Sequence, residues 1–227
     1  SGKGTNAGTY ATTVNDTLYT NGNYAITKVD GSLSIGKKEV ALSVTKEYDG
    51  VTTLSGNQLS IATGVGLETL TYSNATTHSK NVADNATNYV DAVTLSNGTN
   101  GGLASNYKTP SLTSAVAGKN TVAITPAALT LTADSDTNSK TYNGTEQSVS
   151  GFSITSGSLK GSDTSITTLA GIIAGGKGTD AGTYTTTVDD SAFVNSGNYS
   201  LNKVAGSLVI APKEVILSAA KEYDGGK

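Results

Sequence analysis

An acidic loop carries the best set of metal-binding atoms in the sequence. Asp134, Asp136 and Asn138 alternate with small polar residues. Their side-chain oxygens suit Ca²⁺, a hard cation that takes about six to eight oxygen ligands. The loop lacks the glycine and the glutamate that complete an EF-hand loop at about its sixth and twelfth positions. A polar extension of a β-hairpin explains the same residues, so a calcium site and a hairpin extension stay open as alternatives.

The other candidates for chemistry do not form a catalytic group. His78 is the only histidine and lies in a polar stretch, and no Gly-x-Ser-x-Gly nucleophile motif occurs in the chain. The glycine-rich residues 176–179 lack the spacing of a phosphate-binding loop. We therefore expect that the chain is not an enzyme and that it binds no cofactor other than the calcium considered above.

Composition limits the partners of the chain. All 15 basic residues are lysines and the net charge is -3, so we expect no nucleic-acid partner, since such binding depends on clustered cations. No apolar run reaches the roughly 20 residues of a membrane span, so we expect no direct membrane insertion. The lack of cysteine excludes disulfides and zinc-thiolate sites.

One five-residue block recurs three times and organises the elements around it. It reads Lys-Glu-Tyr-Asp-Gly at 46–50 and 221–225, and Lys-Thr-Tyr-Asn-Gly at 140–144. The first and third copies follow alternating apolar residues, the pattern of a half-buried strand. The same alternation places the tyrosine on the apolar face, and Asp-Gly or Asn-Gly predicts a tight turn. The residues expected to be structural are Tyr48, Asp49, Gly50, Tyr142, Asn143, Gly144, Tyr223, Asp224 and Gly225.

Two further blocks also end in tyrosine. The block Asn/Asp-Ala-Gly-Thr-Tyr ends at Tyr10 and Tyr184, and the block Gly-Asn-Tyr ends at Tyr24 and Tyr199. A strip of tyrosines that stacks on sugars is one interpretation of the recurring Tyr48, Tyr142 and Tyr223. A residue that recurs once per repeat at the same position indicates a packing requirement instead, and we expect these tyrosines to be structural as well.

The blocks divide the chain into repeats of similar length. Residues 37–125 (89 residues) and 126–211 (86 residues) each form a complete repeat module. Residues 1–36 match the C-terminal part of a preceding repeat, and 212–227 match the N-terminal part of a following one. We expect the chain to be a piece of a longer array. The alternative is that the two end pieces complete each other between neighbouring molecules.

Strand signals dominate each module. In the first module, residues 40–45, 52–61, 67–73, 88–95 and 118–125 are rich in Thr, Val, Tyr and Ile and are separated by Gly and Asn. Residues 164–174 fit either one short helix or a strand. The sequence therefore predicts an all-β fold with at most short helices, in modules arranged end to end so that the whole chain is elongated.

In this order, the three blocks resemble the YDG and MBG-type (mostly β-grasp) repeats of bacterial filamentous-haemagglutinin-like exoproteins, autotransporters and biofilm adhesins. The resemblance covers essentially the whole chain. The chain departs from the pattern of these repeats at Asn143 and at residues 87–88. It implies tandem β-grasp-like modules in a protein that is secreted or held at the bacterial cell surface.

The resemblance also implies a function. We expect structural stalk or spacer repeats of an adhesin, with a role in cell adhesion, biofilm or fibre formation and with neighbouring repeats of the same polypeptide as their partners. The alternative is a carbohydrate- or polysaccharide-binding module whose partners are glycans, a host surface or the biofilm matrix. A single concave site lined by polar and aromatic residues would favour this alternative.

Overall fold

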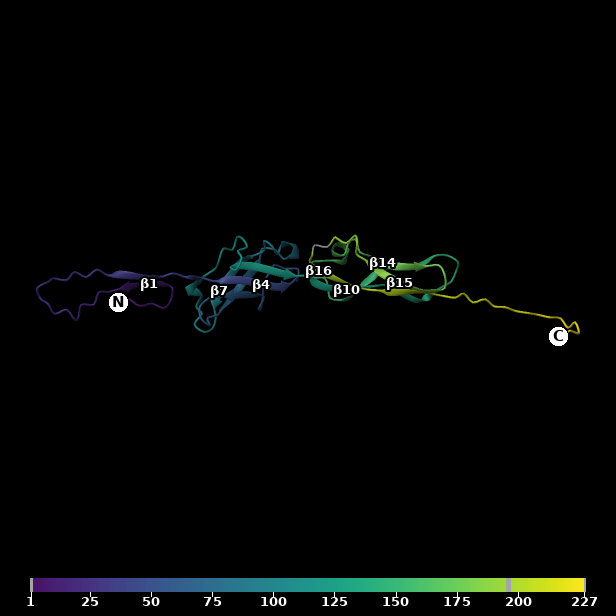
Figure 1. Ribbon diagram of the computed structural model, residues 1–227, viewed down its shortest axis with the longest axis horizontal. Helices are drawn as coiled ribbons and strands as arrows, with labels where there is room; N and C mark the ends of the chain where they lie inside the picture. The colour runs from purple at the N-terminus through teal and green to yellow at the C-terminus, as the bar shows by residue number, and fades with distance from the viewer. Residues whose placement is uncertain (1, 195–196, 227) are drawn as a thin grey trace. The chain divides into compact units, whose positions relative to one another are not determined.

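Alternating apolar and polar residues produce the strands from which the chain is built. The computed structural model, which describes residues 2–194 and 197–226, is all-β apart from short helical turns (Figure 1). It divides into Ser1–Pro126 with Ser196–Asn198, here called unit 1, and Ala127–Asn195 with Tyr199–Lys227, here called unit 2. The division after Pro126 lies next to the junction that the repeat pattern places at 125–126.

Unit 1 is assembled from several small sheets. Its elements are β1 (Gly8–Thr12), β2 (Gly31–Ile35), β3 (Lys38–Glu39), β4 (Ala41–Glu47), β5 (Leu59–Ala62), β6 (Leu70–Thr77), η1 (Val82–Asp84), β7 (Val90–Asn97), η2 (Ala104–Asn106), β8 (Tyr107–Lys108) and β9 (Asn120–Thr125). Strand β4 is central to a three-stranded sheet of order β5-β4-β9, antiparallel to β5 and parallel to β9. Strands β6 and β7 form an antiparallel pair, as do β1 and β2.

Strand β4 shows how the sequence pattern becomes the core. Leu42, Val44 and Lys46 are buried, whereas the residues between them are exposed. Because successive side chains of a strand point to opposite faces, one face of β4 is inside the unit and the other is in water. Val122 and Ile124 of β9 alternate in the same way and add to this core.

Unit 2 contains a three-stranded and a five-stranded sheet. Its elements are β10 (Ala127–Ala133), β11 (Asp136–Thr141), β12 (Gln147–Ser150), β13 (Phe152–Ser156), α1 (Ser165–Thr168), β14 (Ile173–Gly178), β15 (Gly182–Asp189), β16 (Tyr199–Val204) and β17 (Gly206–Ala211). The sheet orders are β13-β10-β16 and β11-β17-β15-β14-β12, with β10 parallel to β16 and β11 parallel to β17. Buried residues of β10 and β17, such as Leu129, Leu131, Leu208 and Ile210, form its core.

Two local expectations are resolved by the structure. Within the stretch 52–61, only residues 59–61 lie in a strand, the first part of β5, because the preceding residues turn at Gly56 and bond to β6 through a single bridge between Thr53 and Thr76. Residues 164–174 are both a short helix and the start of a strand, separated by Gly171 in the left-handed region at φ 86°.

Candidate functional site

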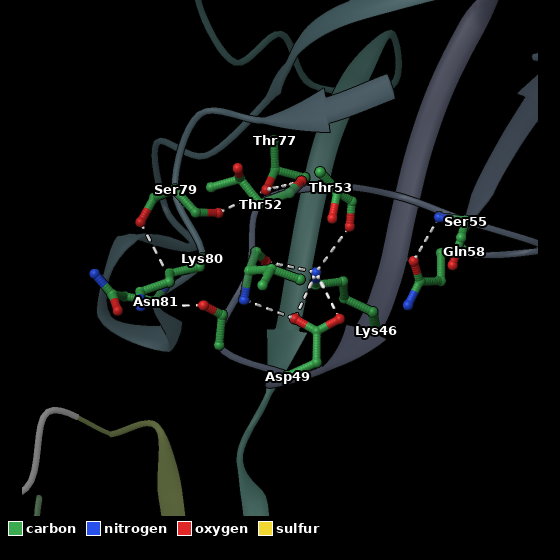
Figure 2. Close-up of polar contacts among 12 residues, drawn as sticks. Lys46, Asp49, Thr52, Thr53, Ser55, Gln58, Thr77, Ser79, Lys80 and Asn81 are labelled. Atoms are coloured by element: carbon green, nitrogen blue, oxygen red, sulfur yellow. Dashed lines mark hydrogen bonds and ion pairs between the residues drawn. The ribbon is translucent and has the colours of Figure 1, made fainter. Parts of the chain in front are cut away.

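A buried lysine lies at the end of β4. The side chain of Lys46 is only 1% exposed, because the alternation of β4 directs it to the apolar face. Its Nζ lies 2.8 Å from Asp49 Oδ1 and 3.0 Å from Oδ2, and it donates to the Val51 carbonyl at 2.8 Å (Figure 2). A buried ammonium is tolerated only when it is paired and hydrogen-bonded, and this turn meets both conditions.

The turn after Tyr48 is held from two sides. Asp49 Oδ1 accepts a hydrogen bond from the Val51 amide at 3.1 Å, while Gly50 takes a φ of 81° that a side chain would resist. From the loop after β6, Lys80 Nζ donates to the Gly50 carbonyl at 3.1 Å (Figure 2). The Tyr-Asp-Gly turn therefore ties β4 to the β6–β7 loop.

The same local geometry recurs at the other two copies of the block. Gly144 and Gly225 take φ values of 80° and 77°. Asn143 accepts from the Thr145 amide, and Asp224 accepts from the Gly226 amide, each at 3.0 Å. Lys221 pairs with Asp224 at 2.9 Å, but both side chains are exposed. The short block thus encodes its own turn, and burial of the lysine depends on the surrounding unit.

The block's three tyrosines differ in burial, which corrects the expectation that all pack in a core. Tyr48 is 1% exposed, whereas Tyr142 is 38% and Tyr223 is 95% exposed. Tyr142 borders an open apolar depression together with Ala181 and Pro212, and its side chain is partly exposed there. Tyr223 belongs to residues 212–226, which form no strand in the structure.

The tyrosines of the other two blocks also differ: three are hydrogen-bonded and at least half-buried, and one is exposed. Tyr10 and Tyr184 are half-buried, and their hydroxyls donate to the carbonyls of Asn6 at 2.8 Å and Asp180 at 3.0 Å. Tyr199 is buried, and its hydroxyl donates to Asp163 at 2.7 Å. Tyr24, expected to be structural, is exposed because residues 24–29 pair with no strand in the described part of the chain.

Two asparagines that the sequence pattern did not single out act as hydrogen-bond partners of strand backbone. Asn85 donates to the Ile124 carbonyl and accepts from the Ile124 amide, both at 2.8 Å. Asn120 is fully buried and bonds in the same way to the amide and carbonyl of Val90, at 2.8 and 2.9 Å. A primary amide carries both a donor and an acceptor, so it can replace a neighbouring strand. Nothing in the pattern separates these two from the chain's many other asparagines.

The acidic loop forms part of β11. Asp136 accepts from the Ser139 amide at 3.1 Å and from its hydroxyl, and it lies 3.8 Å from Lys140 Nζ. These contacts, the Ser139 hydroxyl first, lower the pKa of Asp136. Asp134 and Asn138 are exposed. Among the residues that the structure describes, no three His, Cys, Asp or Glu side chains gather as metal ligands. Calcium binding by Asp134, Asp136 and Asn138 stays a prediction.

The rings of His78 and Tyr72 belong to two surface features of unit 1 that combine an aromatic ring with polar groups. His78 stacks on Tyr89 with ring centroids 4.6 Å apart, and its Nδ1 lies 3.1 Å from the Tyr89 hydroxyl. Separately, a groove of about 400 Å³ lies between β5 and β6, with Tyr72 and the polar residues Ser55 and Asn57 in its lining. The Tyr72 hydroxyl donates to the Gly56 carbonyl at 2.9 Å, which fixes the ring at this groove.

Comparison with known proteins gave no match to a family, to a curated protein or to a solved structure. Within the described residues, no helix is long and apolar enough to cross a membrane. We therefore infer the function from the geometry of each unit by itself.

Proposed function

We propose that this chain is a set of structural spacer repeats from the stalk of a secreted or cell-surface bacterial adhesin. The observation that carries the proposal is the pairing of β4 with β9, the first and last of the longer strands between residues 37 and 125 of unit 1. Strand β4 runs parallel to β9 in continuous register from Leu42–Asn120 to Glu47–Thr125. The chain therefore enters this pair at one end and leaves it at the other.

This pairing suits a segment that carries tension. A force applied along the chain pulls β4 and β9 in opposite directions along their axes, so the inter-strand hydrogen bonds are loaded together. Parallel ladders have evenly spaced bonds, which share such a load. If the strands were loaded from the same end, the bonds would open one after another. Forced unfolding is governed by the unfolding rate, which shared loading keeps low.

Unit 2 repeats the arrangement with different strands. Strand β10 runs parallel to β16 from Ala127–Tyr199 to Thr132–Val204. Strand β11 adds a second parallel pair with β17, near the end of the unit's chain. The two units share this feature although their sheets differ in strand number, which is expected if it is the property that matters for function.

We extend the proposal to the fold of each module and to the location of the protein outside the cell. First and last strands that lie parallel, with an antiparallel neighbour at one side, are what a β-grasp-like module contains. We infer tandem modules of this kind at 37–125 and 126–211, arranged end to end as an elongated stalk. The lack of cysteine is compatible with export to an oxidising surface, and the partners of each module are the neighbouring repeats.

The proposal is tested by stretching single molecules of the 227-residue chain from its ends. Two separate unfolding events are expected, one for each module. An extended chain spans about 3.3–3.6 Å per residue, so each module of 86 or 89 residues should lengthen the chain by about 280–320 Å less the module's own folded end-to-end distance. A chain that extends without discrete events, at forces no higher than those of a flexible linker, would rule out a load-bearing spacer.

A carbohydrate-binding module is the second candidate, and the groove beside Tyr72 is the observation that favours it. An aromatic ring flanked by polar side chains can stack on a sugar and hydrogen-bond its hydroxyls. A glycan array probed with the chain tests this candidate. Binding that Tyr72→Ala abolishes and Tyr19→Ala, an exposed tyrosine outside the groove, leaves intact would support it. No binding to any glycan leaves the spacer role as the function.

A further inference from the structure

Residues 212–226 have the sequence of a core strand but are not in a sheet. They match 37–50 at 10 of the 14 positions from 212 to 225. Leu42 of the earlier segment is 1% exposed, whereas its counterpart Leu217 is 90% exposed. Val215 and Tyr223 are exposed as well. Figure 1 draws this segment as an extended trace with no strand arrow.

Residues 23–35 have the sequence of the strands that pair with such a segment, but they lack this partner among the described strands. They match 198–210 at 8 of 13 positions, and 198–210 includes β16 and most of β17. Tyr199 is buried in β16, whereas its counterpart Tyr24 is exposed. Strand β17 bonds to both β15 and β11, but its counterpart β2 bonds only to β1 among the described strands. The free edge of β2 therefore lacks the parallel neighbour that β17 has.

Both units show which register would join the two segments. At the first end of the ladder, Lys38 pairs with Tyr107 in unit 1, and Ala127 pairs with Tyr199 in unit 2. The corresponding pair is Lys213 with Tyr24. At the other end, Lys46 pairs with Ile124 and Lys140 with Ile210, which corresponds to Lys221 with Ile35. Each end of the ladder expected between residues 24–35 and 213–221 therefore has one observed counterpart in unit 1 and one in unit 2.

A recurring side-chain contact supports the same pairing. In this contact, here called the asparagine clamp, one asparagine side chain bonds to two consecutive residues of another segment. Within unit 1, Asn106 accepts from the Ala7 amide at 2.8 Å and donates to the Asn6 side chain at 2.9 Å. Asn198, also in unit 1, bonds in the same way to Val82 at 2.9 Å and Asn81 at 3.0 Å. Both asparagines directly precede a tyrosine: Asn106 lies in the related sequence Ser-Asn-Tyr at 105–107, and Asn198 lies in the Gly-Asn-Tyr block that ends at Tyr199.

The asparagine at the same position of the Gly-Asn-Tyr block that ends at Tyr24 is Asn23, and it is exposed. Residues Asp180 and Ala181 repeat the position of Asn6 and Ala7 and share the local tyrosine hydrogen bond. They offer a carboxylate acceptor and an amide donor for the Asn23 side chain. Ala181 also borders the open apolar depression beside Tyr142. A segment that docks at Ala181 would cover the exposed side of that ring.

We propose that a second copy of this chain completes these elements in trans. Residues 24–36 of one copy pair in parallel with residues 213–222 of another, and Asn23 clamps Asp180 and Ala181 of that other copy. The contact joins two different surfaces, so it is heterologous, and repetition of it makes open head-to-tail chains. It goes beyond the spacer role, because it assigns the chain a self-association site.

Sedimentation of the 227-residue chain over a range of concentrations tests association. The mean mass should rise steadily with concentration. Leu217→Asp should abolish the rise, since Leu217 corresponds to buried Leu42. Ser218→Asp is the matched control, since Ser218 corresponds to exposed Ser43, and it should associate normally. Both positions are exposed in the single chain, so neither variant should alter folding. A monomer at every concentration, or equal behaviour of the two variants, overturns the proposal.

Disulfide formation tests the register and the partner, because the chain has no cysteine of its own. Ala25→Cys with Glu214→Cys occupies a predicted pair, matching Lys108–Glu39 and Ser200–Ala128. Oxidation should give a ladder of covalent oligomers. Thr27→Cys with Glu214→Cys is two residues out of register and should crosslink poorly, since a disulfide needs Cα atoms within about 7 Å. Equal crosslinking of the two pairs contradicts the register, and a disulfide that closes within one chain contradicts the second copy.

Discussion

Burial of the ion pair between Lys46 and Asp49 distinguishes the first copy of the repeated block from the other two. The lysine is buried because β4 alternates, and the aspartate follows at the spacing that lets its carboxylate reach Nζ. Unit 2 has Asn143 at the aspartate's position, and Lys140 there lies near Asp136 instead. We therefore expect the copy of the block in unit 1 to stabilise its unit more than the copy at 140–144 stabilises unit 2.

Substitution of Asp49 measures the value of this ion pair. Asp49→Asn should lower the free energy of unfolding of unit 1 by about 1–2 kcal/mol, because a charged hydrogen bond to buried Lys46 is lost. The partial exposure of Asp49 keeps the loss below that of a fully buried pair. Asp224→Asn removes the same pair at exposed side chains and should change nothing measurable in a denaturant titration. Equal effects of the two variants would show that burial of Lys46 has no energetic role.

Tyr107 makes the stability of unit 1 depend on alkaline pH. Burial, and then the hydrogen bond that its hydroxyl donates to Glu68 at 2.5 Å, raise the pKa of Tyr107. A raised folded-state pKa means that this contribution is complete below the unfolded-state value of about 10 and is lost as the pH rises through the folded-state value. Thermal melting between pH 9 and pH 12 (about one unit below and two above that reference) should show this fall. Tyr107→Phe should remove part of the slope, and an unchanged slope would contradict the assignment.

At the scale of elements, pairing by asparagine side chains joins the sheets of unit 1. Asn120, at the start of β9, bonds to the backbone of Val90 at the start of β7 and donates to the Ser111 carbonyl at 2.9 Å. The β5-β4-β9 sheet and the β6-β7 pair share no ladder in the described structure. The amide therefore provides a connection that backbone pairing does not.

Removal of this amide should loosen one pair of strands more than the rest. Asn120→Ala leaves the amide and carbonyl of Val90 and the carbonyl of Ser111 without these partners, at a cost of about 2–4 kcal/mol. Amide hydrogen exchange of β7 should accelerate more than that of β4. Asn57→Ala, at an exposed asparagine, serves as the control and should leave exchange unchanged. Uniform acceleration across unit 1 would argue against a local connection.

The sequence predicts the positions of the core strands well, and it predicts the strands outside the core less well. Strand β4 and strand β9 lie close to the predicted ranges 40–45 and 118–125, because alternation of apolar residues is a local signal. The range 52–61 is wrong over most of its length, since a bridge to Thr76 and a turn at Gly56 replace a ladder there. The positions of Tyr142 and Tyr223 depend on neighbours distant in sequence, which a pattern within each block cannot supply.

At the scale of the whole molecule, each unit has its own buried residues. Tyr48 contributes to unit 1 alone, and Tyr48→Ala should cost about 3–5 kcal/mol of stability there. Tyr142→Ala should cost unit 2 clearly less, because the ring is partly exposed. Hydrogen exchange resolved by peptide should show unit 1 destabilised by the first variant while β10 and β17 keep their protection, as expected when repeats interact only with neighbours. Loss of protection in both units would indicate one shared folding unit.

The load-bearing role is tested most directly by pulling unit 1 in two directions. The chain has no cysteine, so paired substitutions give defined attachment points. Lys37→Cys with Pro126→Cys attaches the handles before β4 and after β9, at opposite ends of the parallel pair. Lys37→Cys with Lys119→Cys attaches both handles at the same end. All three positions are exposed. If the parallel β4–β9 ladder bears the load, the first geometry must unfold at several times the force of the second; equal forces, or a weaker first geometry, would contradict the account.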